Sequence, residues 1–324
     1  MQYYDNTMIS GARECLRKYY FRHIKNWRGK GTALPLTFGL SWHDAMDRVW
    51  GLADSNKSDM EILDIAHNAF IETWCEDGLP HPDNLPFEKE QDMRPRTPGI
   101  AREMLHNYIA ARRHMIAHVK IVAIEQPFAV PIYKNKDVMY IGRLDKVFEN
   151  NSGIIIGEHK TTSFYAKESG FRNEFVNSFS PNSQVDGYLH AGHMIYGKDL
   201  KSVWVDAALV HKTVHDKFKF IPVDRLITQL DAWLADTKNW IEIIEIHLQK
   251  LADSRVGKSV GYMTAFPKNT NACYNFMKPC AYMDVCKFVA DPDNMEMPDN
   301  FIEEKWVPFD ILKIEKLGLR KEES

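Results

Sequence analysis

The 324-residue chain contains no apolar run long enough to span a membrane, no low-complexity tract and no internal repeat. Its first residues, MQYYDNTMISGARECLRKYY, lack the apolar core of a secretory signal. These absences exclude the membrane-spanning and fibrous classes of protein. We therefore expect a globular protein of the cytoplasm.

The chain also has little excess of charge of either sign. The 41 Lys and Arg residues against 44 Asp and Glu residues give a formal net charge of −3. A nucleic-acid partner would therefore have to be bound by a local basic patch, because the chain as a whole is not basic. At 44% hydrophobic residues, the chain can form one large domain or two closely packed ones.

Cysteine is scarce, with five residues, which argues against disulfides in a reducing compartment. Three of them, Cys273, Cys280 and Cys286, nevertheless lie in one short segment, CYNFMKPCAYMDVC. The leading candidate for a fourth metal ligand is Cys15, and the second candidate is Cys75. A [4Fe–4S] cluster, a structural zinc ion and unrelated buried thiols all stay open. The spacing favours the cluster, because the paired Cys-x2–4-Cys segments of zinc sites are absent.

The most informative stretch, residues 139–162 (MYIGRLDKVFENNSGIIIGEHKTT), predicts a β-hairpin with its turn at Asn150–Gly153. In a symmetric register, Asp145 lies opposite Glu158. Two opposed carboxylates repel each other unless a cation lies between them. Lys160 follows on the same face as Glu158. Two acids and an amine at one place predict a site for a divalent metal and a phosphate.

This register pairs the apolar residues Val147 and Ile156, which supports it, and turns His159 to the opposite face. It also sets Arg143 opposite Lys160, which is tolerable near carboxylates, near a phosphate or at a fraying strand end. An ordinary surface hairpin with scattered charges is the alternative, since the spacing alone is weak evidence.

A helix is predicted at 8–28, where cations alternate with aromatic residues. Its candidate DNA-binding residues are Arg13, Arg17, Lys18 and Arg22. The alternative is an amphipathic helix whose aromatic side chains belong to the core.

Residues 39–53 predict a second helix, with Ser41 as its N-cap and His43 in its first turn. Composition and periodicity predict the remaining elements. Further helices are expected at 58–76, 98–118, 181–197 and 223–251, strands at 121–133, 202–210 and 218–223, a proline-rich loop at 79–98, and a frayed tail after Leu317. The expected regions are 1–118, 119–252 and 253–324, packed as one compact unit.

Six pieces in this order resemble the PD-(D/E)XK nuclease superfamily, in particular its RecB-type branch. That branch includes the CRISPR-associated iron–sulfur exonucleases and the nuclease domain of AddB. The pieces are Cys15 in an Arg/Tyr-rich segment, His43 in GLSWH, Asp145 in GRLD, Glu158–Lys160 in EHK, Gln184 and Tyr188 in QVDGY, and the three C-terminal cysteines. Two departures are Leu144, where the superfamily name has proline, and the wide Cys-x6-Cys gap, which bears on the type of cluster.

The resemblance implies an α/β fold with a restriction-endonuclease-like core, in which helices flank a mixed central sheet. It implies that Asp145, Glu158 and the backbone carbonyl of His159 hold Mg²⁺ or Mn²⁺, with His43 completing the coordination. Lys160 would orient the attacking water and stabilise the transition state. Gln184 would position the DNA strand or the lysine, and Tyr188 would stack on a base or pack beneath the site. Cys15, Cys273, Cys280 and Cys286 would hold the [4Fe–4S] cluster.

The resulting hypothesis is a metal-dependent DNA exonuclease of phage or prokaryotic type, which acts at DNA ends in recombination, repair or spacer processing. Its partners would be DNA and a recombinase or a CRISPR-adaptation protein. The alternative is a catalytically silent DNA-end-binding or recombinase-partner module. The intact Asp145, Glu158 and Lys160 set argues against that alternative.

Overall fold

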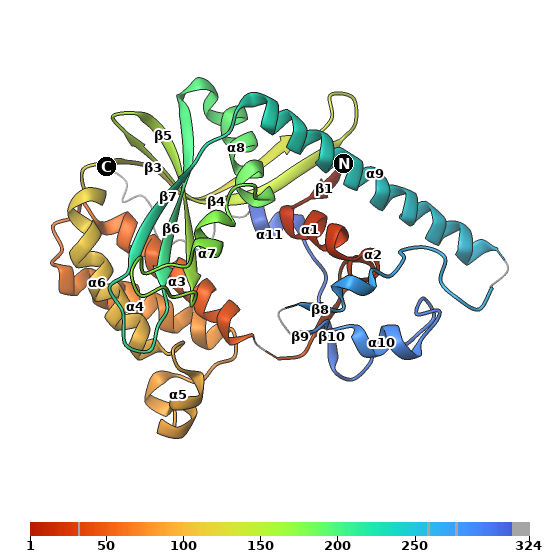
Figure 1. The fold of residues 1–324 in the computed structure, drawn as a ribbon, viewed down its shortest axis with the longest axis horizontal. Helices are drawn as coiled ribbons and strands as arrows, with labels where there is room; N and C mark the ends of the chain where they lie inside the picture. Colours follow the sequence, from red (N-terminus) through yellow and green to blue (C-terminus); the bar gives the residue numbers. More distant parts are fainter. Residues whose placement is uncertain (32, 258–259, 276–277, 313–324) are drawn as a thin grey trace. The chain divides into compact units, whose positions relative to one another are not determined.

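The computed structural model describes residues 1–31, 33–257, 260–275 and 278–312, which form two compact units (Figure 1). The first unit combines Met1–Gly31, Ala129–Gly142 and Ile227–Lys313, and the second combines Thr32–Phe128 and Arg143–Leu226. The two units are interleaved along the chain, and the three predicted regions, 1–118, 119–252 and 253–324, stay a prediction. The predicted tail after Leu317 lies outside the described residues.

The second unit is built around a sheet with strand order β4-β5-β6-β7, in which β3 also pairs with β4. β5 and β6 are parallel, whereas β4 with β5 and β6 with β7 are antiparallel. The predicted mixed sheet is thus confirmed. The strands are β3 (Lys120–Pro131), β4 (Val138–Asn150), β5 (Gly153–Thr162), β6 (Leu200–Leu209) and β7 (Phe218–Val223).

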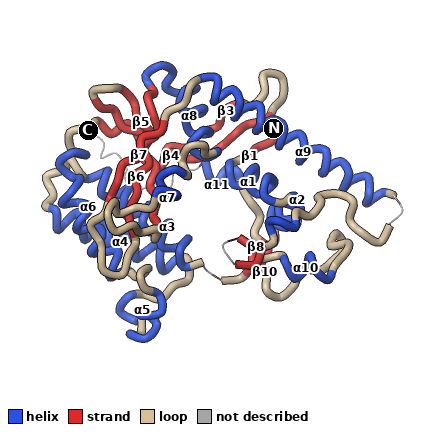
Figure 2. The backbone as a smooth tube through the Cα atoms, in the orientation of Figure 1, coloured by secondary structure: helices blue, strands red, loops and turns tan. Residues whose placement is uncertain are grey.

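Helices flank this sheet on both faces (Figures 1 and 2). α3 (Leu34–Leu52), α4 (Asp59–Glu76) and α6 (Pro98–Ile116) bury a large apolar core that includes Trp42, Trp50, Phe70 and Trp74. α8 (Ser183–Tyr196) covers the other face, where Gly192 approaches Ile156 so closely that a Cβ would lie 2.7 Å from its Cδ1. The short elements of this unit are η2 (Pro82–Asn84), α5 (Phe87–Met93), α7 (Asn173–Asn177) and η3 (Gly197–Asp199).

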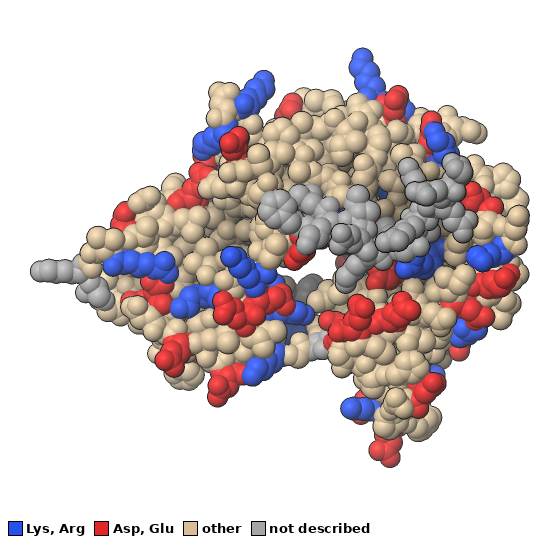
Figure 3. Space-filling model, turned by 180° about the vertical axis from the view of Figure 1, so that it is seen from behind, with Lys and Arg blue, Asp and Glu red and all other residues tan. Residues whose placement is uncertain are grey.

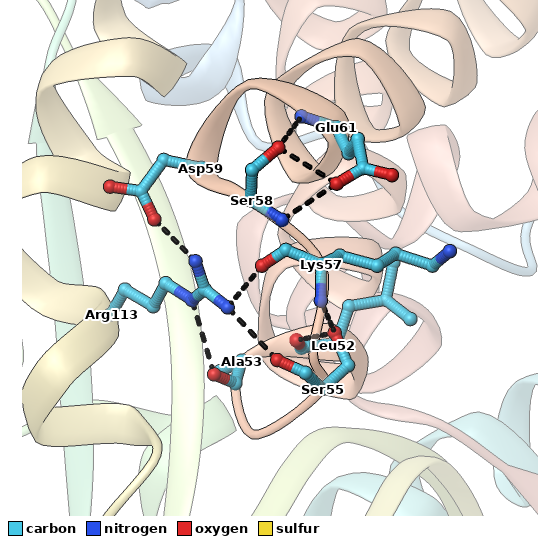
Figure 4. A network of polar contacts seen from close by, with 8 residues as sticks. All are labelled: Leu52, Ala53, Ser55, Lys57, Ser58, Asp59, Glu61 and Arg113. Atoms are coloured by element: carbon cyan, nitrogen blue, oxygen red, sulfur yellow. Dashed lines mark hydrogen bonds and ion pairs between the residues drawn. The ribbon is translucent and has the colours of Figure 1, made fainter.

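Arg113 of α6 binds the turn between α3 and α4 through hydrogen bonds and an ion pair (Figure 4). Its guanidinium donates to the backbone carbonyls of Ala53 (3.2 Å), Ser55 (3.0 Å) and Lys57 (2.5 Å), and it binds the carboxylate of Asp59 at 2.5 Å. Carbonyls at a helix end and in a turn have no regular partner within a helix, and Arg113 supplies one to these three. One side chain thus fixes the relative position of three helices.

The first unit brings together segments from both ends of the chain. β1 (Gln2–Tyr4) pairs in parallel with the start of β4, and β2 (Trp27–Gly29) pairs with β10 (Phe301–Glu303). The remaining elements are α1 (Asn6–Glu14), α2 (Leu16–Tyr19), η1 (Tyr20–Ile24), α9 (Ile227–Val256), η4 (Thr270–Ala272), β8 (Tyr274–Asn275), β9 (Lys278–Pro279), α10 (Met283–Phe288) and α11 (Pro308–Leu312).

The predicted continuous helix at 8–28 is wrong. The backbone of Cys15 is extended (φ −163°, ψ 117°) and separates α1 from α2, and a short π-helix and strand follow. Ser41 is not an N-cap either, because α3 begins at Leu34, with a proline in its first turn. His43 therefore lies in the third turn of α3, on the face that packs toward the sheet.

No helix among the described residues has both the length and the apolar character needed to cross a membrane. Acidic and basic side chains lie intermixed on the molecular face in Figure 3, as the small net charge leads one to expect.

Candidate active site

The predicted hairpin register is confirmed, and the register ends where the candidate site begins. β4 and β5 pair from Asn150↔Gly153 as far as Lys146↔Gly157. Beyond that point β5 stays paired with β6 as far as Thr162. The two strands therefore part at Asp145. Its carboxylate accepts a hydrogen bond from the backbone amide of His159 on β5 (2.8 Å).

Because the strands part, Arg143 and Lys160 do not bring two positive charges together, as the continued register would. The residue does not face Lys160 across a ladder, since the ladder has ended. Its guanidinium instead lies 3.1 Å from the carboxylate of Glu125 on β3.

Glu158 is the centre of the site and is 1% exposed. Its Oε1 accepts hydrogen bonds from Gln184 Nε2 (3.1 Å) and from the ammonium of Lys160. Its Oε2 is buried, and no group among the described residues donates a hydrogen bond to it. A buried carboxylate oxygen that is left unsatisfied costs free energy, so this atom is poised to bind a proton, a water or a cation.

The charged groups of the site shift one another's pKa values. Burial, and then the neighbouring Asp145, raise the pKa of Glu158 above its ordinary value. Burial also disfavours the charged forms of Asp145 and Lys160, but opposite charges outweigh it. His43 lowers the pKa of Asp145, and Glu158 raises that of Lys160. Lys160 is therefore a cation at neutral pH.

α3 and α8 supply the other predicted residues. His43 places its Nδ1 3.2 Å from the Asp145 carboxylate, and this carboxylate raises the histidine's pKa despite burial. Gln184 and Tyr188 lie one turn apart on α8, and Gln184 Nε2 also donates to the tyrosine oxygen (3.0 Å). Tyr188 is 7% exposed and its ring packs on Phe128. It therefore lies beneath the site and is not available to stack on a base.

Sequence reasoning missed a buried polar cluster on the opposite face of β5. His159 lies 3.3 Å from the carboxylate of Asp206, which also accepts a hydrogen bond from Tyr108, and Trp50 Nε1 donates to Tyr108 at 3.0 Å. The ammonium of Lys146 is buried 4.6 Å above the Trp50 ring. A charged residue inside each apolar strand, Lys146 in β4 and Asp206 in β6, is the signal that could have revealed this cluster.

Two further acids adjoin Asp145 and were also missed. Burial and the proximity of Asp145 raise the pKa of Glu125 to about 7, and burial raises the pKa of Asp47 well above its ordinary value. Glu125 has a positive φ of 52°, which is rare for a residue with a side chain and is typical of functional sites. The site is therefore richer in carboxyl groups than the motif alone indicates.

The donor set fits a hard divalent cation, although within the described ranges no three His, Cys, Asp or Glu side chains already stand as a metal-binding group. Asp145 lies near enough to Glu158 for its charge to raise the pKa of that residue, and the buried Glu158 Oε2 has no hydrogen-bond partner in the part of the chain that the structure describes. Oxygen ligands of this kind, completed by water, are those that Mg²⁺ prefers.

The sequence matches the PD-(D/E)XK nuclease superfamily over residues 7–287, which is most of the chain. The chain belongs to this superfamily. Its nucleases commonly use Mg²⁺ or Mn²⁺ and act on DNA. The match runs from α1 through the strands of the site to α10, so it includes every predicted motif residue.

The comparison with solved structures shows a distant likeness. One of these structures, a crystal structure described as a "putative exonuclease" from Eubacterium rectale, has 13% sequence identity and a TM-score of 0.43. The similarity covers 89% of this chain and 94% of that chain. No curated protein sequence matches the chain.

The cysteines predicted to act together lie in the first unit, whereas Cys75 lies in the second. The amide of Asn269 lies 3.4 Å from Cys15 Sγ, and the Cys280 amide donates to the carbonyl of Cys273 (2.8 Å). Burial raises the pKa of both Cys280 and Cys286, and Cys15 raises them further by its proximity. All four cysteines are free thiols.

The basic residues of the first unit are largely engaged within the protein. Arg17 is 3% exposed and donates to the carbonyl of Phe266 (2.9 Å), and Arg22 binds Glu304. Lys18 pairs with Glu14 one turn earlier. The aromatic residues between them belong to the core, as the alternative interpretation held: Tyr19, Tyr20, Phe21 and Trp27. Contact of Arg13, Lys18 and Arg22 with DNA stays a prediction. Arg17 is too deeply buried to reach a phosphate.

Proposed function

We propose that the protein is a divalent-metal-dependent deoxyribonuclease of the RecB-type branch, which hydrolyses phosphodiester bonds at DNA ends. Membership of the nuclease superfamily and the joint position of Asp145, Glu158 and Lys160 support the hydrolysis. The resemblance of the six ordered motifs to RecB-type exonucleases supports action at ends, in recombination, repair or spacer processing.

Mg²⁺ or Mn²⁺ would be held by Asp145, Glu158 and the carbonyl of His159, with His43 beside Asp145. When bound, the ion would lower the pKa of a water and neutralise charge on the phosphate. The protein's part is to present both carboxylates in their ionised form. His43 lowers the pKa of Asp145 despite burial, whereas burial and Asp145 raise the pKa of Glu158, so a cation bound there would offset the cost of its charge.

Lys160 would orient the attacking water and stabilise the negative charge that develops on the scissile phosphate. Its ammonium is fixed by the hydrogen bond to Glu158 and by the field of Asp145, so little reorganisation is needed during the reaction. Gln184 positions Glu158 by a direct hydrogen bond, and Tyr188 supports Gln184. We therefore assign Gln184 and Tyr188 positioning roles.

The observation that carries the proposal is the ion pair of Lys160 with the buried Glu158, whose pKa is raised by burial and by the nearby charge of Asp145. The test is cleavage of 5′- and 3′-labelled single- and double-stranded DNA with Mg²⁺ or Mn²⁺. We expect mononucleotides or short fragments to be released from ends, and closed circular DNA to be resistant. The Asp145→Asn variant should be inactive with every substrate.

The alternative is a DNA-end-binding module without catalysis. Binding of DNA ends by the wild-type protein without cleavage in either metal would favour it. The complete set of Asp145, Glu158 and Lys160 favours the enzyme, because a site that serves binding alone has no need for all three.

We further propose that Cys15, Cys273, Cys280 and Cys286 bind a [4Fe–4S] cluster with a structural role. The four thiols come from both ends of the chain and lie in one unit, and Lys268 and Arg17 provide positive charge beside Cys286. Four thiolates carry a charge that such cations help to balance. A structural zinc ion is the alternative occupant.

A further inference from the structure

Three large apolar side chains are exposed near the catalytic groups. Leu36 is 55% exposed, Leu40 is 47% exposed and Phe164 is 43% exposed. Leu36 and Leu40 lie one turn apart on α3, and His43 follows Leu40 by three residues, so the three share one stripe of the helix. We name Leu36, Leu40 and Phe164 the apolar rim.

The two parts of the rim come from adjacent elements. A Cβ placed on Gly39 would lie 3.8 Å from Thr161 Oγ1, so the first turns of α3 lie against the end of β5. Phe164 follows Lys160 by four residues. Even a fully extended chain places it within about 14 Å of the catalytic lysine.

The loop that carries Phe164 is held by its own hydrogen bonds. The Phe164 amide donates to Thr162 Oγ1 (3.1 Å), and the Phe164 carbonyl accepts from the Arg172 amide (3.0 Å). Arg96 reaches the loop at Ser163 Oγ (3.3 Å). The loop buries another aromatic residue, Phe171, at 2% exposure. The loop therefore buries Phe171 and leaves Phe164 exposed.

Apolar side chains gain nothing from contact with phosphates, but they bind the faces of unpaired bases. In a duplex those faces are already stacked on their neighbours. We propose that the apolar rim binds unpaired bases of a DNA strand whose phosphate lies at Glu158 and Lys160, so that single-stranded or frayed ends are the preferred substrate. This inference rests on the proposed nuclease function and adds the class of strand.

The test measures binding of the full chain to two fluorescent probes in EDTA: an oligothymidine and a duplex closed by a hairpin at each end. Phe164→Ala and the Leu36→Ala/Leu40→Ala double variant should each weaken oligothymidine binding about tenfold, the effect of losing one stacked base. Closed-duplex binding should change less than roughly twofold. Phe164→Trp should bind oligothymidine as the wild type does.

Met60→Ala is the matched control, because Met60 is also 55% exposed. Met60 follows Asp59 in the chain. Arg113 binds both Asp59 and the carbonyl of Ala53, so Met60 lies near the carboxyl end of α3. That end lies about 25 Å along the helix from Leu36. The Met60→Ala variant should bind both probes as tightly as the wild type does.

Equal weakening of both probes, no weakening of either, or no binding of oligothymidine by the wild type would overturn the inference. So would a lowered Tm with unchanged DNA binding, which would assign the rim to packing within the protein. Failure of the wild type to cleave any DNA would count against the nuclease proposal alone, because the binding measurement needs no catalysis. Normal binding by Phe164→Ala in an active enzyme would count against the rim alone.

Discussion

At the scale of single residues, the site is defined by charges that influence one another inside the protein. Burial and the neighbouring Asp145 raise the pKa of Glu158, and the charges of Glu158 and Asp145 raise the pKa of Lys160 despite its burial. His43 acts in the opposite direction on Asp145: it lowers the pKa of this carboxyl and favours its ionised form despite burial. The arrangement stores an electrostatic cost in Glu158 that a divalent cation would relieve.

Lys160→Ala should lower kcat for DNA cleavage by about 10² to 10³, the effect of removing one preorganised electrostatic group. DNA binding and Tm should stay close to those of the wild type. Steady-state kinetics and anisotropy measure the two effects separately. Lys201→Ala, at an exposed position of β6, is the control and should leave kcat unchanged. Retained cleavage in Lys160→Ala would remove the lysine from the mechanism.

Glu158→Gln should raise Tm in EDTA at pH 8. The folded-state pKa of Glu158 is raised, so the folded protein binds this proton more tightly than the unfolded chain does, and its stability falls as pH rises through that pKa. Glutamine imitates the protonated form and removes the cost. The gain should shrink as pH falls toward the ordinary pKa of glutamate, because the wild-type residue is then protonated too.

Differential scanning fluorimetry across this pH range measures the effect. Glu149→Gln is the control, since Glu149 lies exposed on β4 and pairs with Lys120 at the surface. Its Tm difference from the wild type should be small at every pH. A lower Tm for Glu158→Gln at pH 8 would show that the Lys160 and Gln184 contacts outweigh the cost of burial.

At the scale of the elements, the catalytic helix α3 depends on contacts made far from the site. Its carboxyl end and the turn into α4 are held by Arg113, which reaches three backbone carbonyls and one carboxylate (Figure 4). Hydrogen bonds from a charged donor contribute more than neutral ones, and losing the donor leaves several acceptors unsatisfied.

Arg113→Ala should therefore lower the free energy of unfolding by about 2–4 kcal/mol, measured by urea denaturation. Arg102→Ala is the matched control on the same helix. Arg102 pairs with the exposed Asp64, a surface ion pair of the kind that contributes about 0–1 kcal/mol. Equal losses in the two variants would contradict the role of the carbonyl contacts.

At the scale of the whole molecule, the first unit gathers both ends of the chain around the four cysteines. β1 pairs with β4, β2 pairs with β10, and Cys15 lies near Cys280 and Cys286. A cluster bound by these thiols would hold segments that are more than 250 residues apart in the sequence. Closing such a long loop stabilises the folded state mainly by restricting the unfolded chain.

Anaerobically purified protein should accordingly be brown and absorb at about 400 nm. Cys15→Ser should lower Tm as much as Cys280→Ser, whereas Cys75→Ser should change Tm little, because Cys75 belongs to the other unit. Absorbance, iron content and Tm are the measurements. A colourless protein with one bound zinc would replace the cluster by zinc, and a large effect of Cys75→Ser alone would refute Cys15 as the fourth ligand.

Much of the sheet and the site followed from local patterns. Alternation and turn chemistry placed the hairpin and its register, and the pairing of Val147 with Ile156 held. The helices at 58–76 and 98–118 were also predicted nearly to their ends from composition and periodicity. Such features depend on residues close together in the chain, and these are what a sequence pattern reports.

The tertiary structure alone decided the rest. The extended backbone at Cys15, the use of Arg17 and Arg22 within the protein, and the cluster of Lys146, His159 and Asp206 all depend on partners distant in the sequence. The sequence by itself determined the superfamily and the register of the hairpin that carries Asp145, Glu158 and Lys160. The packing of the chain decided which charges are buried and which apolar side chains stay exposed near them. Burial and the interaction of charges depend on distances in the folded protein, which the order of residues along the chain does not give.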